Sequence, residues 1–350
     1  MAAGYRITEG RLGGEPTVSV SAPDGSVHAV LALRGATLLS WRTRRAAAAG
    51  APLTDLTDGY RDEAELLAQD GVRAGLMAPF CNRVADGRYR FRGREHDLLP
   101  GRRGDRTIYH GFAREAPFEL VGSTTTADSA RLLLRTTAIR PGRYPGYPFA
   151  IDVEAEFTVG GHELAIEVRA ANTGDATAPY AAGWHPYFTL SRPLDDLSLH
   201  IPARTLVRTD AALLPPPGDA AFLPLDRCPG MDFRVPRPLG DAVIDACFAD
   251  LSPGPDGRAE TVLSDPATGE ELRVWQYGGY MHVFTGDTLA RDRRASIALE
   301  PVEAMTDAFN RPEHAAALSL EPGGRRRFRF GVRYAPAPAH VGEHRAARNP

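Results

Sequence analysis

A histidine stands in a segment that is otherwise apolar and small. His185 lies within AAGWHPYFTL, residues 181–190. In an extended strand, alternate residues share one face, so His185 is expected to share its face with Ala181, Gly183 and Tyr187. Such a face offers space and a hydroxyl for hydrogen bonding. A histidine in this place is either a hydrogen-bonded core residue or a group that exchanges protons beside a cavity.

A glutamate occupies a similar place in a second segment. In SIALEPVEAMTDAFN, residues 296–310, Ser296, Ala298 and Glu300 share one face, and Pro301 is expected to end the strand. A carboxylate at a strand end is either a solvated surface group or a proton acceptor in a pocket. Two ionisable groups, each on a face of small residues, favour a shared cavity in which one acts as general acid and the other as general base.

Three further residues could hold a polar ligand. Arg83 precedes a turn in NRVADGRYRF, and His110 stands beside Gly111 in YHGF, where the backbone is expected to approach a ligand closely. Asp245 lies in the apolar run VIDACF. An unpaired buried carboxylate is costly, so Asp245 needs partners, which are either the groups of a turn or the hydroxyls of a sugar.

The residue composition argues against several other kinds of catalytic site. All 41 basic residues are arginine, so the chain has no lysine for a Schiff base or for a nucleotide-binding P-loop. The patterns GxGxxG, GxSxG, HExxH and CxxC are missing as well. His340 and His344 are four residues apart near the end of the chain, and we do not expect them to bind a metal. The remaining chemistry is what His, Asp, Glu and Arg can do alone.

Charge and cysteine content indicate the surroundings of the protein. A formal net charge of −3 is unlike the basic surfaces that bind nucleic acid or anionic membranes. We find neither a signal peptide nor a run of about 18 apolar residues that could span a bilayer. Cys81, Cys228 and Cys247 are odd in number and widely spaced, which favours a reduced, cytoplasmic location. The oligomeric state, monomer or homodimer, stays open.

Alternation with period two dominates the chain and predicts β-strands. In residues 149–159, FAIDVEAEFTV, apolar side chains alternate with Asp, Glu and Thr, and the same pattern returns in residues 162–170, HELAIEVRA. With a turn at Gly160-Gly161, the two runs predict an antiparallel hairpin. Helical periodicity is weak and is expected only over residues 61–70, RDEAELLAQD.

The arrangement of the strands predicts the fold class. Many short strands separated by Gly, Pro and Asp turns are typical of an all-β fold, a large antiparallel sandwich or barrel with few short helices. No polar linker divides the chain, so we expect one domain over residues 1–335. The segment 336–350, which is rich in Pro, Ala and Arg, is expected to be a disordered tail.

An ordered set of short motifs resembles a known family, the aldose 1-epimerases or galactose mutarotases. The resemblance covers residues 5–335 and implies a large antiparallel β-sandwich of the galactose mutarotase-like supersandwich type. The motifs that carry it, in the family's order, are NRVADGRYRF, YHGF, YPFAIDVEAEFTV, NTG, WHPYFTL, MDFR, VIDACF, HVFTGD and LEPVEAMTDAFN.

The resemblance also implies a reaction and a role for each site residue. His185 matches the family's general acid and Glu300 its general base, while Arg83, His110 and Asp245 match residues that bind the sugar. A mutarotase opens and recloses the ring of an aldose to interconvert its anomers, which one acid and one base can catalyse without a metal or an organic cofactor. The expected partner is a monosaccharide. His185 should then be protonated near neutral pH, which a nearby carboxylate favours.

The chain departs from the family's best-known members at several positions. Trp184 replaces a small polar residue, Ala246 replaces a histidine, and His282 replaces a glutamine near the substrate. We therefore place His282 among the substrate-binding residues. The acid–base pair is kept, but the sugar that the protein prefers stays open.

Two alternative functions remain. The run HGFAR resembles the related hexose-6-phosphate mutarotases, and that function predicts that Arg83, Arg114 and Arg143 converge at one end of the pocket. The other alternative is a non-catalytic carbohydrate-binding protein of the same fold. It predicts that His185 and Glu300 do not meet across a cavity.

Overall fold

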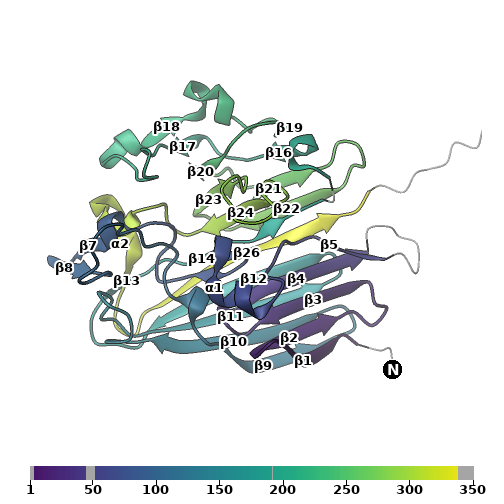
Figure 1. The fold of residues 1–350 in the computed structure, drawn as a ribbon, viewed down its shortest axis with the longest axis horizontal. Coiled ribbons are helices and arrows are strands. Elements are labelled where there is room, and N and C mark those ends of the chain that lie inside the picture. The colour runs from purple at the N-terminus through teal and green to yellow at the C-terminus, as the bar shows by residue number, and fades with distance from the viewer. Residues whose placement is uncertain (1–3, 45–51, 191, 338–350) are drawn as a thin grey trace, which may run out of the picture.

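A computed structural model describes residues 4–44, 52–190 and 192–337, and every structural statement below concerns these residues (Figure 1). Within them the chain forms 26 β-strands and two α-helices of at most six residues, which confirms the predicted all-β class. Neither of these helices has the length or the apolar run that a helix needs to cross a bilayer. Except for Pro336 and Ala337, the predicted tail lies outside the described residues, as do His340 and His344.

The largest sheet has nine strands in the described chain, all antiparallel to their neighbours. The C-terminal strand of the fold, β26, lies between β22 and β12. In spatial order the strands are β19 (Arg237–Pro238), β16 (Ser198–His200), β21 (Ala259–Ser264), β22 (Glu271–Gln276), β26 (Arg325–Ala335), β12 (Glu163–Asn172), β11 (Ile151–Gly160), β10 (Ala130–Ile139) and β9 (Glu119–Thr125).

Two further sheets accompany the large one. The five-stranded sheet follows chain order: β1 (Arg6–Leu12), β2 (Glu15–Ser21), β3 (Val27–Ala32), β4 (Thr37–Arg44) and β5 (Leu53–Asp55). The eight-stranded sheet has the order β18 (Phe222–Pro224), β17 (Thr205–Val207), β20 (Asp245–Ala249), β23 (Tyr280–Phe284), β24 (Ile297–Val302), β14 (Gly183–Trp184) and β6 (Leu76–Met77), and β15 (Tyr187–Phe188) also pairs with β24.

The remaining elements are short. The predicted helix in residues 61–70 is confirmed as α1 (Glu63–Ala68), which the Asp62 side chain caps by accepting a bond from the Glu65 amide. The others are α2 (Ala315–Leu318), the strand pairs β13 (Ala178–Pro179) with β25 (Ser319–Leu320) and β7 (Arg88–Phe91) with β8 (Arg94–Asp97), and the 3₁₀ turns η1 (Asp70–Val72), η2 (Ala85–Gly87), η3 (Ala113–Glu115), η4 (Leu194–Asp196), η5 (Gly218–Ala221), η6 (Leu225–Arg227), η7 (Pro229–Met231), η8 (Ala308–Asn310) and η9 (Pro312–His314).

The hairpin of β11 and β12 shows why the alternating sequence forms strands. The apolar residues of β11, such as Val153 and Phe157, are fully buried, while Glu154, Glu156 and Thr158 between them are partly exposed. The hairpin is confirmed, but its turn lies one residue later than predicted. Gly160 still pairs with Glu163, so Gly161 and His162 make the turn, and Gly161 adopts a positive φ of 53°.

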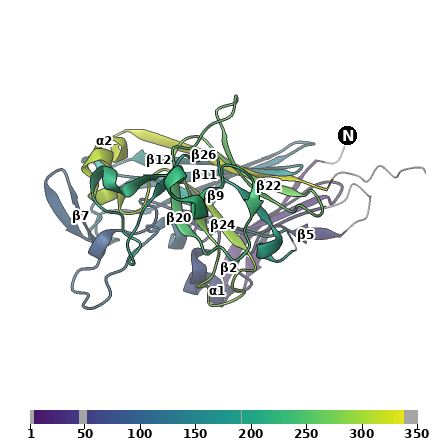
Figure 2. The same cartoon turned by 90° about the horizontal axis from the view of Figure 1, so that it is seen from above.

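The sheets pack face to face around one continuous cluster of buried apolar side chains. The five-stranded and eight-stranded sheets form a layer against the large sheet (Figures 1 and 2). Trp184 of β14 stacks on Phe330 of β26 with ring centroids 5.7 Å apart, and a bridge between Thr57 and Phe188 joins the two smaller sheets. This arrangement is the antiparallel sandwich that the sequence predicted. The single-domain boundary at residue 335 stays a prediction.

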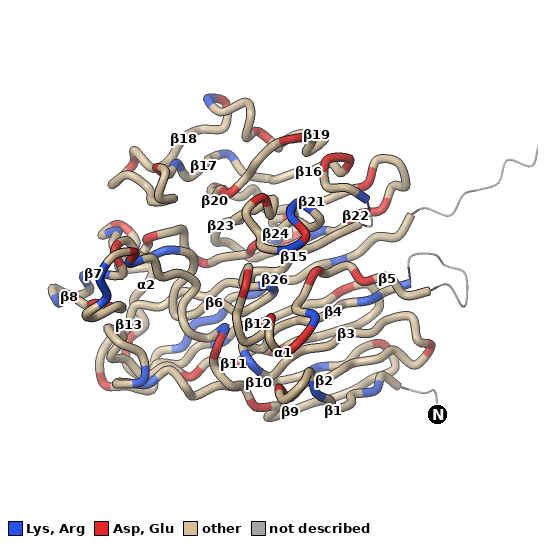
Figure 3. Tube along the Cα trace, viewed as in Figure 1, with Lys and Arg blue, Asp and Glu red and all other residues tan. Residues whose placement is uncertain are grey.

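Arginine and acidic residues are interspersed over most of the trace (Figure 3). On the large sheet, Arg169 pairs with both Glu156 and Glu167, and Arg273 pairs with Glu260. Each of these side chains is partly exposed, so such pairs contribute little stability individually. Their effect is to keep the solvent face of the sheet polar.

Candidate active site

A cavity of about 230 Å³ lies where the middle of the eight-stranded sheet meets loops from the first third of the chain. All six residues that the sequence analysis selected line it: Arg83, His110, His185, Asp245, His282 and Glu300. The other lining residues are Asp70, Gly71, Val72, Asn82, Tyr109, Tyr187, Phe284, Thr288 and Leu289.

The predicted acid–base pair meets inside this cavity. Nε2 of His185 lies 3.3 Å from Oε1 of Glu300, and their side chains are only 7% and 2% exposed. The Nδ1 atom of His185 has no hydrogen-bond partner among the described residues. The two groups are therefore close enough to exchange a proton and are shielded from bulk water.

His185 reaches the cavity in a different way from the one predicted. The strand expected over residues 181–190 is broken, because β14 ends at Trp184 and β15 begins at Tyr187. The backbone of His185 is held instead by the segment beside it: its N–H donates to Gly75 O, and its carbonyl accepts from the Ala74 amide. The histidine is thus fixed on both sides without being part of a regular strand.

The small neighbours of His185 serve packing rather than space. A Cβ at Gly183 would lie 2.9 Å from Cys81 Sγ, from Met77 Cε and from Val302 Cγ1. Ala181 is 1% exposed and belongs to the core. The expectation that these residues open room for a ligand is therefore wrong. Tyr187, by contrast, does line the cavity and stacks on His185 with ring centroids 5.2 Å apart.

Glu300 lies within β24 and not at its end. Pro301 was expected to end the strand, but β24 continues to Val302. On one side of Pro301 the Leu299 amide donates to Pro186 O, and on the other side the Glu303 amide donates to Ala182 O. The strand accommodates a residue without an N–H because its neighbours keep their hydrogen bonds.

Asp245 has the partner that its position requires. Its Oδ1 lies 2.9 Å from Nε2 of His282, and the two residues come from the neighbouring strands β20 and β23. On β24, Glu300 stands directly opposite His282 in the register of the sheet. The four side chains thus lie in a row: Asp245 contacts His282, His282 stands opposite Glu300, and Glu300 contacts His185.

His110 lies on the other side of His185. The two rings meet edge to face, with centroids 5.0 Å apart. The backbone N–H of Asn82 donates to Nδ1 of His110 at 3.3 Å, so Nε2 carries the proton of the neutral ring and is free to donate it to a ligand. Asn82 and His110 both have positive φ angles, 53° and 63°, which non-glycine residues adopt rarely.

Gly111 has a different role from the one expected. A Cβ at Gly111 would lie 2.2 Å from the carbonyl oxygen of Ala78. The following amides, of Phe112 and Ala113, both donate to that same oxygen. The close backbone approach is therefore to the protein's own chain and holds His110 in place, whereas the sequence analysis expected it to face a ligand.

The three arginines that a phosphate site would need do not converge. Arg83 lines the cavity, but Arg114 pairs with Glu115 and lies 5.7 Å from the ring centroid of Tyr109. Arg143 is exposed. Neither Arg114 nor Arg143 is among the described residues that line the cavity.

Burial determines the protonation of the acid–base pair. It raises the pKa of Glu300 to about 8, although the His282 charge beside it acts in the opposite direction. Burial, followed by the His282 charge, lowers the pKa of His185 to about 3. The expectation that His185 is protonated near neutral pH is therefore not met, because burial places the proton on Glu300.

The other two histidines differ in charge. Burial, and then the nearby His185, lower the pKa of His110 well below its usual value, so this ring is neutral. Burial also disfavours the charged form of His282, but the Glu300 charge and the hydrogen bond with Asp245 outweigh burial and raise its pKa. The cavity thus contains one neutral and one positively charged imidazole on either side of the acid–base pair.

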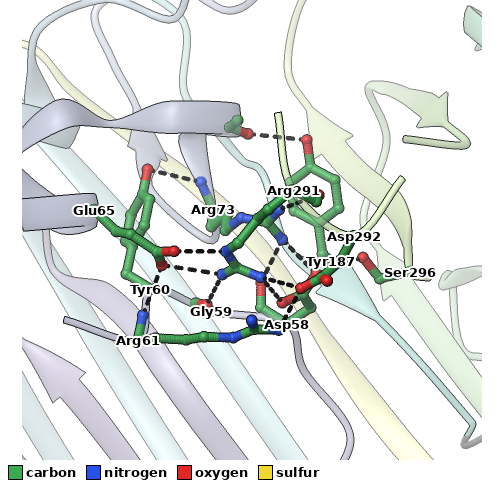
Figure 4. Close-up of polar contacts among 11 residues, drawn as sticks. Asp58, Gly59, Tyr60, Arg61, Glu65, Arg73, Tyr187, Arg291, Asp292 and Ser296 are labelled. Atoms are coloured by element: carbon green, nitrogen blue, oxygen red, sulfur yellow. Dashed lines mark hydrogen bonds and ion pairs between the residues drawn. The ribbon is translucent and has the colours of Figure 1, made fainter. Parts of the chain in front are cut away.

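A buried ion-pair network supports one wall of the cavity (Figure 4). The guanidinium of Arg73, which is 1% exposed, pairs with Asp58 and lies 5.1 Å from the ring centroid of Tyr187. Arg291 binds the same carboxylate from a second loop, with Nη1 2.8 Å from Oδ1 of Asp58. The Tyr187 hydroxyl donates to Gly71 O, which lies in the wall itself.

Sequence reasoning missed that wall. Gly71 and Val72 come from η1, and Thr288 and Leu289 come from the loop after β23. Val72 has a φ of 51°, which is rare for a β-branched residue. The only signal in the sequence is the pair Asp70-Gly71 after the helix, which indicates a turn but no ligand.

A metal would need a different set of side chains. Among the described residues, no three His, Cys, Asp or Glu side chains are grouped so as to hold a metal ion. Asp245 instead hydrogen-bonds with His282, and Glu300 pairs with His185, while His282 and Glu300 lie opposite each other in the sheet. The arrangement is suited to moving protons between oxygen atoms of a small polar molecule.

Comparison with protein families is consistent with this geometry. The family model for aldose 1-epimerase matches residues 16–333. The chain is 26% identical to the uncharacterized Escherichia coli protein YihR over 259 residues, which are 73% of this chain and 77% of YihR.

Solved structures show the same fold. The galactose 1-epimerase of Lactobacillus acidophilus superposes with a TM-score of 0.78 at 14% identity, covering 95% of this chain and 99% of that chain. A GalM/aldose epimerase homologue from C. elegans superposes with a TM-score of 0.74 at 18% identity, covering 89% and 97%. The architecture is therefore the galactose mutarotase-like sandwich that the motifs predicted.

Proposed function

The chain belongs to the aldose 1-epimerase family, and from that premise we propose that it is a cofactor-free mutarotase, an isomerase that interconverts the α and β anomers of an aldose. The observation that carries the proposal is the contact of His185 with Glu300, 3.3 Å apart inside a small cavity. A general acid and a general base are what the reaction needs.

The proposed reaction moves two protons and breaks one bond. The base takes the proton of the anomeric hydroxyl, the acid protonates the ring oxygen, and the bond between C1 and that oxygen breaks. The open-chain aldehyde rotates about its C1–C2 bond. Closure on the other face returns both protons, so the pair ends in its initial state.

The pair must hold one proton to act as both acid and base. The family resemblance assigns the acid to His185 and the base to Glu300. Burial places the proton on Glu300, and a transfer over the 3.3 Å between the two groups produces the other arrangement. Both arrangements contain one proton, so the apparent pKa values of about 3 and about 8 belong to the pair. Between these two pH values the pair holds the single proton that the reaction needs.

The remaining residues are proposed to bind the sugar. His110 can donate from Nε2, and Arg83 supplies a cation at the same cavity. Asp245 is 33% exposed, which leaves its second oxygen open to a hydroxyl while the first binds His282. Neutral and charged donors of this kind suit the hydroxyl groups of a monosaccharide.

Polarimetry of freshly dissolved α-D-glucose and α-D-galactose tests the proposal. We expect the wild-type protein to accelerate mutarotation, and we expect His185→Ala and Glu300→Gln each to lose about 10²–10⁴-fold of that acceleration. Glu303→Gln is a matched control, because Glu303 is a partly buried carboxylate whose pKa is also raised, to about 7, but it does not line the cavity. Full activity of Glu300→Gln would remove Glu300 from the mechanism.

If the protein accelerates the mutarotation of neither sugar, two further measurements distinguish the alternative functions. Acceleration only with glucose 6-phosphate or galactose 6-phosphate would indicate a sugar-phosphate mutarotase. Binding of sugars by calorimetry without any acceleration would indicate a carbohydrate-binding protein. No observation in the cavity favours either alternative, since Arg114 and Arg143 do not line it.

A further inference from the structure

His282 occupies a place in the sheet that a simple sugar-binding residue would not need. It stands opposite Glu300 on one neighbouring strand and opposite Cys247 on the other. Its Nε2 is already bound to Asp245 at 2.9 Å, and its side chain is 10% exposed. Cys247 lies opposite the same ring on β20. The imidazole is thus fixed by Asp245 and by its place between two strands before any ligand arrives.

We infer that His282, anchored by Asp245, is a positioning residue whose positive charge sets the proton affinity of the Glu300–His185 pair. The inference rests on the proposed function and deepens it, because it concerns the control of the same acid–base pair. It assigns to His282 a role that does not require contact with the reacting atoms.

The geometry explains why this charge matters. Side chains directly opposite each other in an antiparallel pair have Cβ atoms about 4.5–5.5 Å apart. Glu300 is 2% exposed, so little water screens its carboxyl group from a charge on the side chain opposite. A positive charge there stabilises the carboxylate of Glu300 and opposes a second positive charge on His185.

Other ionisable groups also face Glu300, and they differ in charge and in how firmly the fold holds them. From the packed elements these are His282 on β23, Asp245 on β20, His185 and Tyr187 beside β14 and β15, and Arg83 and His110 from the loops, with the thiols of Cys81 and Cys247 also nearby. His110 is neutral. Arg83 is a permanent cation, but it comes from a loop, whereas His282 is fixed in the sheet opposite the carboxylate.

The protonation of the groups agrees with this role. Burial alone disfavours a charged His282, yet Glu300, where it is ionised, and Asp245 raise its pKa. Near neutral pH, where Glu300 still holds its proton, the ionised Asp245 keeps the ring an imidazolium. Burial raises the pKa of Glu300 to about 8, and the largest opposing effect is the His282 charge. Without that charge Glu300 would hold its proton to a still higher pH.

The test is the variant His282→Gln, which keeps a hydrogen-bonding side chain and removes the charge. In the wild type, kcat/KM should fall above about pH 8, where the pair loses its proton. In His282→Gln we expect this alkaline limb to move to higher pH by roughly 1–3 units. His314→Gln is the control, because His314 is a half-buried imidazole outside the cavity, and its profile should match the wild type.

A residue that only binds substrate gives a different result. In that case His282→Gln would raise KM and leave the alkaline limb where it is in the wild type, which would overturn the inference. Should the variant fold poorly, ¹⁵N NMR of the wild-type ring decides instead. We expect both ring nitrogens of His282 to be protonated at pH 7, and a neutral ring would overturn the inference.

The proposed function and this inference can fail separately. If no sugar is turned over, the mutarotase proposal fails, but the titration of Glu300 remains measurable. The infrared carboxyl band that disappears in Glu300→Gln reports that titration directly. We expect the band to titrate at higher pH in the His282→Gln background than in the wild type, and equal titration would overturn the role of His282.

Discussion

Glu300 is a carboxylic acid enclosed in protein, and its ionisation opposes folding. Its pKa is about 8 in the folded protein and close to the ordinary value of 4.5 when the chain is unfolded. Below pH 4.5 the group is protonated in both states and has no effect. Between pH 4.5 and 8 only the unfolded state loses the proton, so the folded state loses stability as the pH rises.

We therefore expect Glu300→Gln to be more stable than the wild type above pH 4.5. The advantage should be absent at pH 4, should grow by about 1.4 kcal/mol for each pH unit above 4.5, and should level off near pH 8. Urea unfolding of both proteins from pH 4 to pH 9 measures it. A difference that does not depend on pH would show that Glu300 titrates normally in the folded protein.

At the scale of residues, the sequence predicts which groups meet but not how they are charged. His185, Glu300, Arg83, His110, Asp245 and His282 were all selected from the sequence, and all six line the cavity. The protonation of His185 was predicted wrongly, because it depends on burial and on the charge of a neighbour. Neither quantity is visible before the chain is folded.

At the scale of elements, the wall of the cavity depends on two loops that are far apart in the sequence. Arg73 lies next to η1 and Arg291 lies after β23, and both bind Asp58 (Figure 4). Tyr187 contacts Arg73 on one side and stacks on His185 on the other. The network thus links the position of His185 to the position of the wall.

We expect Arg73→Met to destabilise the protein because it leaves a buried carboxylate with fewer partners. Breaking a buried ion pair costs about 3–5 kcal/mol, and the lower end applies here since Arg291 still binds Asp58. Arg61→Met is the matched control from the same network, because Arg61 is 62% exposed and should cost less than about 1 kcal/mol. Guanidinium unfolding compares the two variants, and equal losses would contradict the buried role of Arg73.

Elements with regular alternation were predicted well, and elements at the site were not. The hairpin of β11 and β12 follows from period two, and only its turn shifts, by one residue. The strand around His185 is broken, and β24 passes through Pro301, because tertiary hydrogen bonds to Gly75, Pro186 and Ala182 replace the local pattern. Such bonds join segments that lie far apart in the sequence, so no local rule reveals them.

At the scale of the whole molecule, one core joins all three large sheets. Trp184 of the eight-stranded sheet stacks on Phe330 of the nine-stranded sheet. A bridge from Thr57, two residues after β5, to Phe188 links the five-stranded sheet to the eight-stranded one. The order of the nine-stranded sheet could not be predicted from the sequence. It pairs β26 with β12, whose sequence positions are more than 150 residues apart.

We expect urea unfolding to be a single cooperative transition, because no described part of the core is separate from the rest except for two small satellite clusters. Tryptophan fluorescence reports Trp41 in the five-stranded sheet, Trp184 in the eight-stranded sheet and Trp275 in the nine-stranded sheet. Its midpoint should coincide with that of far-ultraviolet circular dichroism. Two separate midpoints would contradict the expectation of one domain over residues 1–335.

The central place of β26 has a consequence for synthesis on the ribosome. Of the nine strands of the large sheet, β9–β12 leave the ribosome first, and β16, β19, β21 and β22 follow. Strand β26, which lies between the two groups, emerges after both. Until then β12 and β22 each present an edge without its final neighbour, and such edges invite pairing with other chains. The nascent polypeptide therefore keeps the β12 edge unpaired while more than 150 further residues are made, and that is the interval in which a molecular chaperone would protect it most.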